Sequence, residues 1–346
     1  MGLSCSMAAM LGGAMILAVM GRRIIFILSV VLLGAVWQRA SAQKEKGLIK
    51  RADSLLTQRY KRSKVDTTYI VRPKTKWTLK GRLNVSGATI EMEGQRKVSP
   101  LRARMNSADK TTISFAVNYM GVAVALALNP AKLAGKYKDF ELNLNAYGNR
   151  YGFDFIYQDA RNFKGWYKEE GTGRIELPPD MLRLRSLNIN GYYVFNYRRF
   201  SYPAAFTQSY IQRRSAGSFM LAASLQTQNL KTEGELNSKL KAFNIGLGAG
   251  YGYNLVVRRN WLFHLSALPT IIVYSHTSLK VEDEHLPMNY RFPEFIVTGR
   301  GAIVRQIGRW FVGASMVYNF TNIGNANQLS VYNDKWRTRV FVGFRL

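Results

Sequence analysis

Two polar side chains in the stretch 260–275 have the types and the spacing for nucleophilic chemistry. His264 and Ser266 lie at positions i and i+2, so both project from one face if this stretch is a β-strand. A serine hydroxyl becomes a nucleophile when an imidazole accepts its proton and a third group orients the ring. The sequence shows no acid or amide matched to this pair, so a hydrolytic site and a chance pairing are both retained as hypotheses.

A second candidate site consists of basic residues that alternation places on the polar face of predicted strands. Glu141 and Asp154 are the sparse counter-charges on that face. Arginine and lysine side chains that line a pore favour anions. The alternative is structural, because such side chains also pair with acids and amides to fill a narrow barrel. The basic residues concerned are Lys80, Arg82, Arg300, Arg337, Arg339 and Arg345.

A third candidate is the long polar and aromatic segment 198–216, which carries the pairs Arg198-Arg199 and Arg213-Arg214. Long connections in compact domains often have a function. We predict that this segment, with its four arginines, folds into a lumen as a plug or constriction. The alternating glycines of 246–252 would give it an inner wall without side chains. The alternatives are that these glycines relieve crowding in a curved wall, or that the segment forms two further short strands.

Several other chemistries find no support in the sequence. The acidic run 281–287, VEDEHLP, is interpreted as a solvated loop in preference to a divalent-cation site. The chain has neither a phosphate-binding loop nor zinc-ligand spacing, so no metal and no cofactor are predicted. The net charge of +28 suggests an anionic partner, but the charges are scattered singly and 47% of residues are hydrophobic. Nucleic acid is therefore not a predicted partner.

The N-terminal 42 residues predict a secretory signal peptide. Arg22-Arg23 precede an apolar run at 24–37, and Ala40-Ser41-Ala42 form a cleavage site before Gln43. The apolar run before Met20 suggests that Met20 is the true start, with a longer leader or an uncleaved anchor as the alternative. Residues 43–76 then predict a short periplasmic amphipathic helix followed by an extended segment.

The elements that must position these side chains are strands. From Trp77 onward, stretches of about ten residues alternate apolar with polar or small residues, and Gly, Asn and basic turns separate them. A strand of this length crosses a bilayer when tilted, and closure satisfies every backbone hydrogen bond. The stretches are 77–90, 110–119, 121–128, 138–147, 150–159, 185–197, 217–229, 241–257, 260–275, 294–306, 309–321 and 334–346. We therefore predict an all-β fold, a transmembrane antiparallel β-barrel of about 12 strands over residues 77–346, with 14 as the alternative.

The lengths of the connections agree with this topology. Bacterial outer-membrane barrels have short periplasmic turns and longer external loops. With both termini in the periplasm, every short connection falls on the periplasmic side, and only 198–216 is too long for its place. The competing fold is a water-soluble β-sandwich or lipocalin-like barrel, which also alternates. Trp, Tyr and Phe near the strand ends favour the membrane barrel.

The chain ends in the strand WRTRVFVGFRL, residues 336–346, with alternate apolar residues. This ending resembles the signal by which the outer-membrane assembly machinery recognises barrel precursors. The runs 66–87 and 191–219 and the hexapeptide FDFIYQ at 153–158 resemble a Bacteroidetes family that is known as a domain of unknown function. The resemblance covers residues from Tyr60 to the C-terminus. It implies a location in the bacterial outer membrane and brings no catalytic or binding residues.

We therefore predict an outer-membrane β-barrel that is either a narrow, basic-lined pore for anionic solutes or a structural barrel in contact with lipopolysaccharide. The alternative from another class is a lipid hydrolase. The pair of Ser266 and His264 resembles that of outer-membrane phospholipases and lipid A deacylases. The turn predicted at 258–260 argues against it, because this turn puts His264 near the opposite membrane surface. A third class is an assembly partner that uses the N-terminal helix.

Overall fold

The structure is a computed structural model and describes residue 54 and most of residues 64–346. The residues outside the description in that range are 97–98, 108, 120–121, 131–138, 162, 170, 172, 179–180, 233–237, 282–283, 289–291 and 326–328. The chain divides into Met1–Ser63 and Lys64–Leu346, and the second unit is described below. The predicted signal peptide and N-terminal helix lie outside the described residues, apart from residue 54. Within the described part of the chain, no helix has the length and apolarity needed to span a bilayer.

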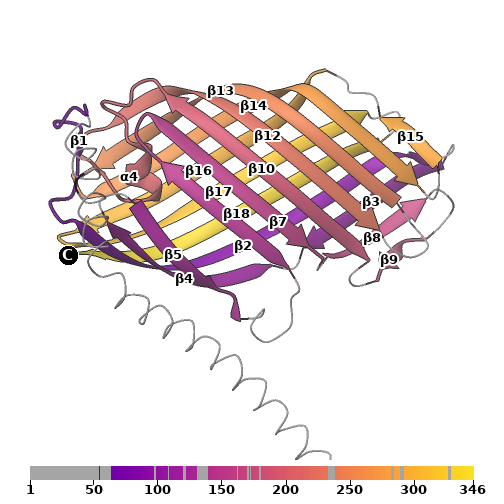
Figure 1. The fold of residues 1–346 in the computed structure, drawn as a ribbon, viewed down its shortest axis with the longest axis horizontal. Helices are drawn as coiled ribbons and strands as arrows, with labels where there is room; N and C mark the ends of the chain where they lie inside the picture. The colour runs from indigo at the N-terminus through magenta and orange to yellow at the C-terminus, as the bar shows by residue number, and fades with distance from the viewer. Residues whose placement is uncertain are drawn as a thin grey trace, which may run out of the picture. The chain divides into compact units, whose positions relative to one another are not determined.

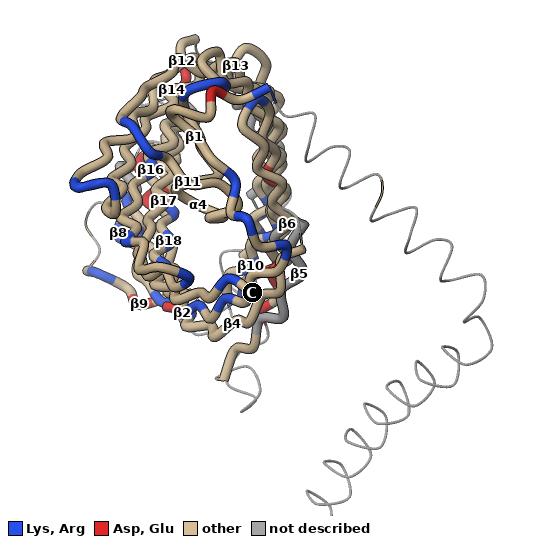
Figure 2. Tube along the Cα trace, turned by 90° about the vertical axis from the view of Figure 1, so that its left-hand side faces the viewer, with Lys and Arg blue, Asp and Glu red and all other residues tan. Residues whose placement is uncertain are grey.

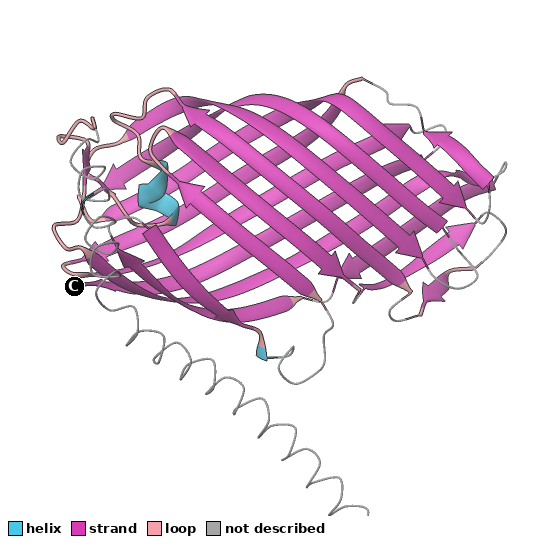
Figure 3. Cartoon of the chain, in the orientation of Figure 1, coloured by secondary structure: helices cyan, strands magenta, loops and turns pink. Residues whose placement is uncertain are grey.

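Antiparallel strands make up almost all of the second unit (Figures 1 and 3). The large sheet contains β2 (Trp77–Arg96), β3 (Ser99–Ser107), β4 (Lys110–Tyr119), β5 (Val122–Leu128), β6 (Phe140–Tyr147), β7 (Tyr151–Ala160), β8 (Phe163–Glu169), β9 (Ile175–Leu177), β10 (Leu182–Val194), β12 (Ala216–Thr232), β13 (Ser238–Val257), β14 (Trp261–Val281), β15 (Glu284–Met288), β16 (Glu294–Ile307), β17 (Trp310–Asn325) and β18 (Leu329–Arg345). A separate pair is formed by β1 (Ile70–Val71) and β11 (Ile211–Gln212), and α4 spans Tyr202–Phe206. Each of the twelve predicted stretches overlaps one of these strands, although the sheet in the described part of the chain has 16 strands in place of the predicted 12.

The sheet curls on itself because its last long strand pairs with its first. β18 pairs with β2 from Arg345↔Thr78 to Leu329↔Gly94. A second closing contact joins β3 to β8, which follows β7 in the chain. β5 pairs with β4, and β6 pairs with β7, so these two short strands occupy only one half of the wall. Viewed from the end that holds the C-terminus, the strands form a ring (Figure 2).

The outer face of this ring is apolar at the end near the termini. Trp77, Leu79 and Leu83 on β2 are more than 40% exposed, while Thr78 and Lys80 between them are buried inside. Two rows of aromatic side chains mark the edges of the apolar belt. At the edge near the short turns, the ring centroids of Trp77 and Tyr119 lie 4.5 Å apart. At the edge next to the collar, the ring centroids of Phe243 and Tyr274 lie 6.1 Å apart. Aromatic girdles of this kind lie at the two interfaces of a bilayer.

Beyond the belt the inward side chains become apolar and the outward side chains become polar. On β2 the same alternate positions continue to point inward along the whole strand. On β2, Ile90 turns inward and is 2% exposed, whereas Glu91 and Glu93 face outward and lie 3.2 and 3.7 Å from Arg104 and Arg102. The same inversion occurs on β10, β12 and β13, so this end of the barrel stands in water. We call it the collar; it consists of β3, β8, β9 and the ends of the long strands beyond the belt. The ranges 91–109 and 160–184 lie between our predicted strands, where we expected loops, and the structure instead has β3, β8 and β9 there.

Buried apolar side chains cluster inside the collar. They come from β2, β3, β7, β8, β10, β12, β13 and β18, and each is at most 8% exposed. We call this set the collar core: Ile90, Ala103, Met105, Ala160, Phe163, Leu182, Leu184, Leu230, Leu240 and Val331. The turns at 148–150, 258–260 and 308–309 lie at the opposite end, with the termini of the barrel. Short turns are typical of the periplasmic end of outer-membrane barrels, so we expect the collar to lie on the extracellular side.

Candidate functional site in the barrel lumen

Residues 200–212 lie inside the periplasmic end of the barrel, and we call 195–215, which adds the more exposed residues on either side, the plug segment. Its helix α4 begins after Ser201, whose hydroxyl accepts a hydrogen bond from the backbone N–H of Ala204 at 3.3 Å, and Pro203 lies in the first turn. All five residues of α4 are buried, and Figure 2 shows α4 and β11 within the ring of strands. The fourteen-strand alternative placed two wall strands here. The structure instead has α4 and β11, and neither belongs to the large sheet.

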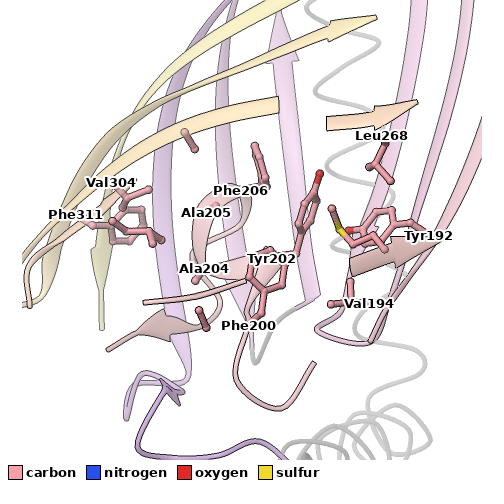
Figure 4. Close-up of a cluster of buried hydrophobic side chains, with 14 of the residues drawn as sticks. Tyr192, Val194, Phe200, Tyr202, Ala204, Ala205, Phe206, Leu268, Val304 and Phe311 are labelled. Atoms are coloured by element: carbon pink, nitrogen blue, oxygen red, sulfur yellow. The ribbon is translucent and has the colours of Figure 1, made fainter. Parts of the chain in front are cut away.

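Three aromatic side chains of the plug segment, Phe200, Tyr202 and Phe206, are labelled in Figure 4, and their rings pack around the imidazole of His264. The ring centroids of Phe200, Tyr202 and Phe206 lie 5.9, 5.2 and 5.0 Å from that of His264. Phe200 and Tyr202 are fully buried, and the cluster extends to Phe311 on the wall.

A chain of three polar side chains lies directly beneath these rings. His264 Nδ1 is 2.7 Å from Asn254 Oδ1, and His264 Nε2 is 3.0 Å from Ser266 Oγ. Asn254 Nδ2 also donates to Ser201 O at 2.9 Å and to Gln212 Oε1 at 3.0 Å. The arrangement satisfies the geometric requirement for an activated serine. The same hydrogen bonds also fix the plug segment to β13, and all three wall residues are at most 4% exposed.

The predicted basic residues nearest the periplasmic end bind the plug segment. Lys80 Nζ donates to Thr207 O at 2.9 Å and also contacts Gln208 Oε1. Arg345 donates to Gln306 Oε1 at 2.7 Å, and its guanidinium lies 4.6 Å from the Phe311 ring centroid. Their charges therefore face protein oxygens and aromatic faces within the barrel.

A buried ion pair joins the plug segment to the middle of the lumen. Arg300 Nη2 lies 2.7 Å from Asp154 Oδ2, with the two side chains 7% and 4% exposed. Arg300 Nη1 donates to Tyr202 Oη at 2.9 Å, and Tyr147 Oη donates to Asp154 Oδ1 at 2.5 Å. Wall strands and α4 thus meet in one hydrogen-bonded network.

The remaining predicted basic residues lie above this network. Arg337 forms an ion pair with Glu141, and Arg339 Nε donates to Asn84 Oδ1 at 2.7 Å. Arg82 also faces the interior, between Lys80 and Asn84 on β2. All six predicted basic residues therefore lie inside the barrel, at different heights.

A polar cavity of about 130 Å³ separates the plug segment from the collar core. Its wall includes five cationic side chains, two carboxylates and eight amides. The charged ones are Lys110, Arg300, Lys335, Arg337, Arg339, Glu141 and Asp154. A volume of this size holds on the order of ten water molecules. The cavity is therefore polar and cationic.

A family model now identifies what this chain belongs to. The model described as "Domain of unknown function (DUF4421)" matches residues 64–346. The chain belongs to the DUF4421 family. A curled antiparallel sheet whose first and last long strands pair, with an apolar outer belt and aromatic side chains near its edges, is the architecture of bacterial outer-membrane proteins. This DUF4421 protein is accordingly an outer-membrane β-barrel.

No curated protein matches the sequence. Among solved structures, the outer-membrane protease OmpT from Escherichia coli is 9% identical, with 80% of this chain and 98% of that chain covered and a TM-score of 0.41. OprG, an outer-membrane protein from Pseudomonas aeruginosa, is 11% identical over 79% and 96% of the chains, with a TM-score of 0.26. The beta domain of the Bordetella autotransporter BrkA is 11% identical over 77% and 99%, with a TM-score of 0.32. These values transfer no activity to the DUF4421 protein.

The four arginines predicted to line a plug lie at its ends. Arg198, Arg199, Arg213 and Arg214 of the DUF4421 barrel are exposed, and the buried residues of the plug segment lie between the two pairs. The guanidinium groups of Arg199 and Arg214 lie 5.2 and 5.9 Å from the ring centroid of Tyr69. β1, which follows Tyr69, then pairs with β11. The extended segment before the barrel therefore holds the plug segment from the periplasmic side.

The glycines at 246–252 have two different surroundings in this DUF4421 protein. A Cβ at Gly252 would lie 3.1 Å from Phe200 of the plug segment, which fits a wall cleared for the plug. A Cβ at Gly248 or Gly250 would instead lie 2.5 Å from Pro269 O or 2.0 Å from Ala267 O on β14. Two of these glycines therefore relieve crowding between neighbouring strands, as our alternative held.

The sequence analysis did not identify Asn254 as the hydrogen-bond partner of His264. The turn at 258–260 joins β13 to β14, and pairing outward from it brings Asn254 opposite His264. Counting the register from that predicted turn would therefore have found Asn254. The side chains of the acidic run 281–287 lie outside the described residues from 281 onward. Among the described residues, no group of three metal-ligating side chains occurs.

Proposed function

We propose that this DUF4421 protein is a sealed outer-membrane barrel that acts through its outer surface and does not conduct solutes through an open lumen. The packing of α4 inside the periplasmic end carries this proposal, because all five of its residues are buried. The collar core supports it at the other end of the cavity. Two separate apolar layers would have to move before a solute could cross.

The basic lumen has a structural explanation in this account. Lys80 and Arg345 bind plug-segment oxygens, Arg300 binds Asp154, and Arg337 binds Glu141. A passing anion would have to compete with protein carboxylates that are already in place. Buried charges of this kind are retained only when they are paired. The lumen therefore supports a fixed interior better than an anion filter.

The outer surface is the part of the barrel that remains available for partners. Its belt contacts membrane lipid, and its collar stands where lipopolysaccharide head groups lie. The C-terminal strand β18 pairs along its whole length with β2, and its ending supports recognition by the assembly machinery as a proposal. Outer-membrane lipid and lipopolysaccharide are accordingly the partners that we propose.

Conductance in planar bilayers tests the sealed lumen. We expect no stable current steps from the native chain, and none after residues 200–211 are replaced by a glycine-serine linker, because the collar core still closes the other end. Combining that replacement with Met105→Ala, Leu184→Ala and Leu230→Ala is expected to give anion-selective current. Stable steps from the native chain would contradict the proposal and support a pore.

A lipid hydrolase is the second candidate function, and the hydrogen-bonded chain of Asn254, His264 and Ser266 supports it. In that chemistry His264 Nε2 accepts the hydroxyl proton as Ser266 Oγ attacks an ester carbonyl, while Asn254 fixes the imidazole tautomer. Ser266 is only 3% exposed beneath the plug segment, which argues against access by a lipid.

Labelling with a fluorophosphonate separates the two functions. We expect no labelling of the folded native chain, because the plug segment covers Ser266. Labelling that is absent in Ser266→Ala but retained in Ser218→Ala would instead support the hydrolase. Ser218 is a suitable control because it is also 3% exposed inside the barrel and has no histidine partner among its described hydrogen bonds.

A further inference from the structure

Four basic residues lie side by side across four adjacent strands of the collar. Arg183 on β10 is opposite Lys231 on β12, Lys231 is opposite Lys239 on β13, and Lys239 is opposite Lys280 on β14. Lys241 lies two residues from Lys239 on the same face. We call these five residues the basic row. Neighbouring strands are about 4.8 Å apart, so the row is roughly 14 Å wide.

The basic row faces outward, away from the collar core. The alternate residues Leu182, Leu230 and Leu240 point inward and are at most 8% exposed. Lys231 and Lys241 are exposed. Side chains that are directly opposite across an antiparallel pair interact, and like charges there destabilise the sheet. An anion that approaches from outside the wall would relieve this repulsion.

The opposite wall of the collar shows that such crowding is not a general property of this barrel. On β2 and β3, Arg104 pairs with Glu91 at 3.2 Å and Arg102 pairs with Glu93 at 3.7 Å. Arg183 of the basic row has a carboxylate partner, because its Nη2 lies 2.6 Å from Asp159 Oδ2. Lys231, Lys239 and Lys241 have no carboxylate within ion-pair distance among the described residues. One wall thus pairs its described arginines with carboxylates, whereas these three lysines face outward without a carboxylate partner among the residues that the structure describes.

Apolar side chains lie on the same outer face of the same strands, on the membrane side of the row. β10 contributes Leu187 and Ile189, β12 contributes Leu225, and β13 contributes Ile245 and Leu247. Ile245 and Leu247 are 37% and 56% exposed. The face therefore presents clustered cations at the outer membrane edge and apolar columns that run into the bilayer beneath them. This order matches a lipid that carries several phosphates on its head group and acyl chains below.

We propose that the basic row and the apolar columns beneath it bind a phosphorylated glycolipid of the outer leaflet. Lysine ammonium groups bind phosphate oxygens as charge-assisted hydrogen bonds. Phosphates spaced along a sugar head group would lie against the lysines, and the acyl chains would pack on the apolar columns. The site rests on the proposed function, since it names the lipid that the outer surface of the sealed barrel contacts.

Native mass spectrometry of the purified full chain in detergent, with bis-phosphorylated lipid A as the probe, tests this site. We expect Lys231→Gln/Lys239→Gln/Lys241→Gln to weaken lipid A binding by about ten- to a hundredfold, the loss expected for three lysines near an anionic lipid. The control Arg102→Gln/Arg104→Gln changes the opposite wall and is expected to bind like the native chain. Heat-modifiable gel migration confirms that each variant is folded.

Two further probes distinguish the lipid from a simple anion. Dephosphorylated lipid A is expected to bind the native chain as weakly as lipid A binds the triple variant. Inorganic phosphate at millimolar concentration is expected not to displace lipid A. Equal binding by the folded triple variant, equal binding of the dephosphorylated lipid, or complete displacement by phosphate would each overturn the site. None of these outcomes bears on conductance, so the lipid site and the sealed lumen fail separately.

Discussion

Replacing Arg300 with methionine is expected to destabilise the folded barrel by about 3–5 kcal/mol. The substitution leaves the Asp154 carboxylate, which is 4% exposed on its side chain, without its cation. It also removes the donor to Tyr202 Oη and so loosens α4 from the wall. Urea unfolding of the lipid-reconstituted barrel, followed by heat-modifiable migration, measures the change in free energy.

A double variant separates the buried charge from the lost packing. Arg300→Met/Asp154→Asn is expected to recover most of the stability, because no uncompensated charge then remains inside. Arg174→Met is the matched surface control, since Arg174 and Glu176 pair at 2.8 Å but are 59% and 67% exposed. An exposed pair of this kind contributes about 0–1 kcal/mol. Equal losses for Arg300→Met and Arg174→Met would contradict the buried network.

Replacing Tyr202 with alanine is expected to release the plug segment. Tyr202 is 0% exposed, and its ring lies 4.9 Å from that of Tyr192 and 4.8 Å from that of Phe206. Removing a large buried aromatic side chain costs about 3–5 kcal/mol. Trypsin cleavage at Arg199 and Arg213, measured in the folded barrel, reports the opening of the segment. A local loss of about 3 kcal/mol raises the cleavage rate roughly a hundredfold.

Tyr202→Phe provides the matched control. It keeps the ring in place and removes only the hydroxyl that accepts from Arg300. The expected rise in the cleavage rate is about tenfold, which corresponds to the loss of one hydrogen bond to a charged group. If Tyr202→Ala were cleaved no faster than the native chain, the rings around His264 would not be what holds the segment.

The sequence predicted the membrane part of this barrel well because a single physical rule operates there. Lipid outside and polar side chains inside give every strand the same alternation, as in β2 from Trp77 to Val85. The collar strands were predicted as loops because that rule inverts beyond the belt. Ile90 and Met92 are apolar at even positions, where Lys80 and Arg82 are polar. A search for strands in which the apolar residues change from odd to even positions would have found β3 and β8.

The candidate site was predictable in part. Alternation alone placed the six basic residues inside and put His264 and Ser266 on one shared face, because a strand has only two faces. Their partners were not predictable, since Asp154 and Arg300 lie on strands separated by 146 residues and meet only after closure. The plug segment was located by its excess length. Its buried part was missed because the prediction rested on its arginine pairs, and α4 is made of the apolar residues between them.

Cysteine labelling of the plug segment tests the sealed lumen most directly. The sequence from residue 64 onward contains no cysteine, so single introduced thiols report only their own positions. Ala205→Cys lies at a site with 0% exposure inside the barrel, and Arg213→Cys lies at an exposed site at the edge of the segment. In the folded, lipid-reconstituted barrel, a membrane-impermeant maleimide is expected to modify the Arg213→Cys variant rapidly and the Ala205→Cys variant only after unfolding. Equal labelling rates for the two variants in the folded protein would show an open lumen and contradict the account.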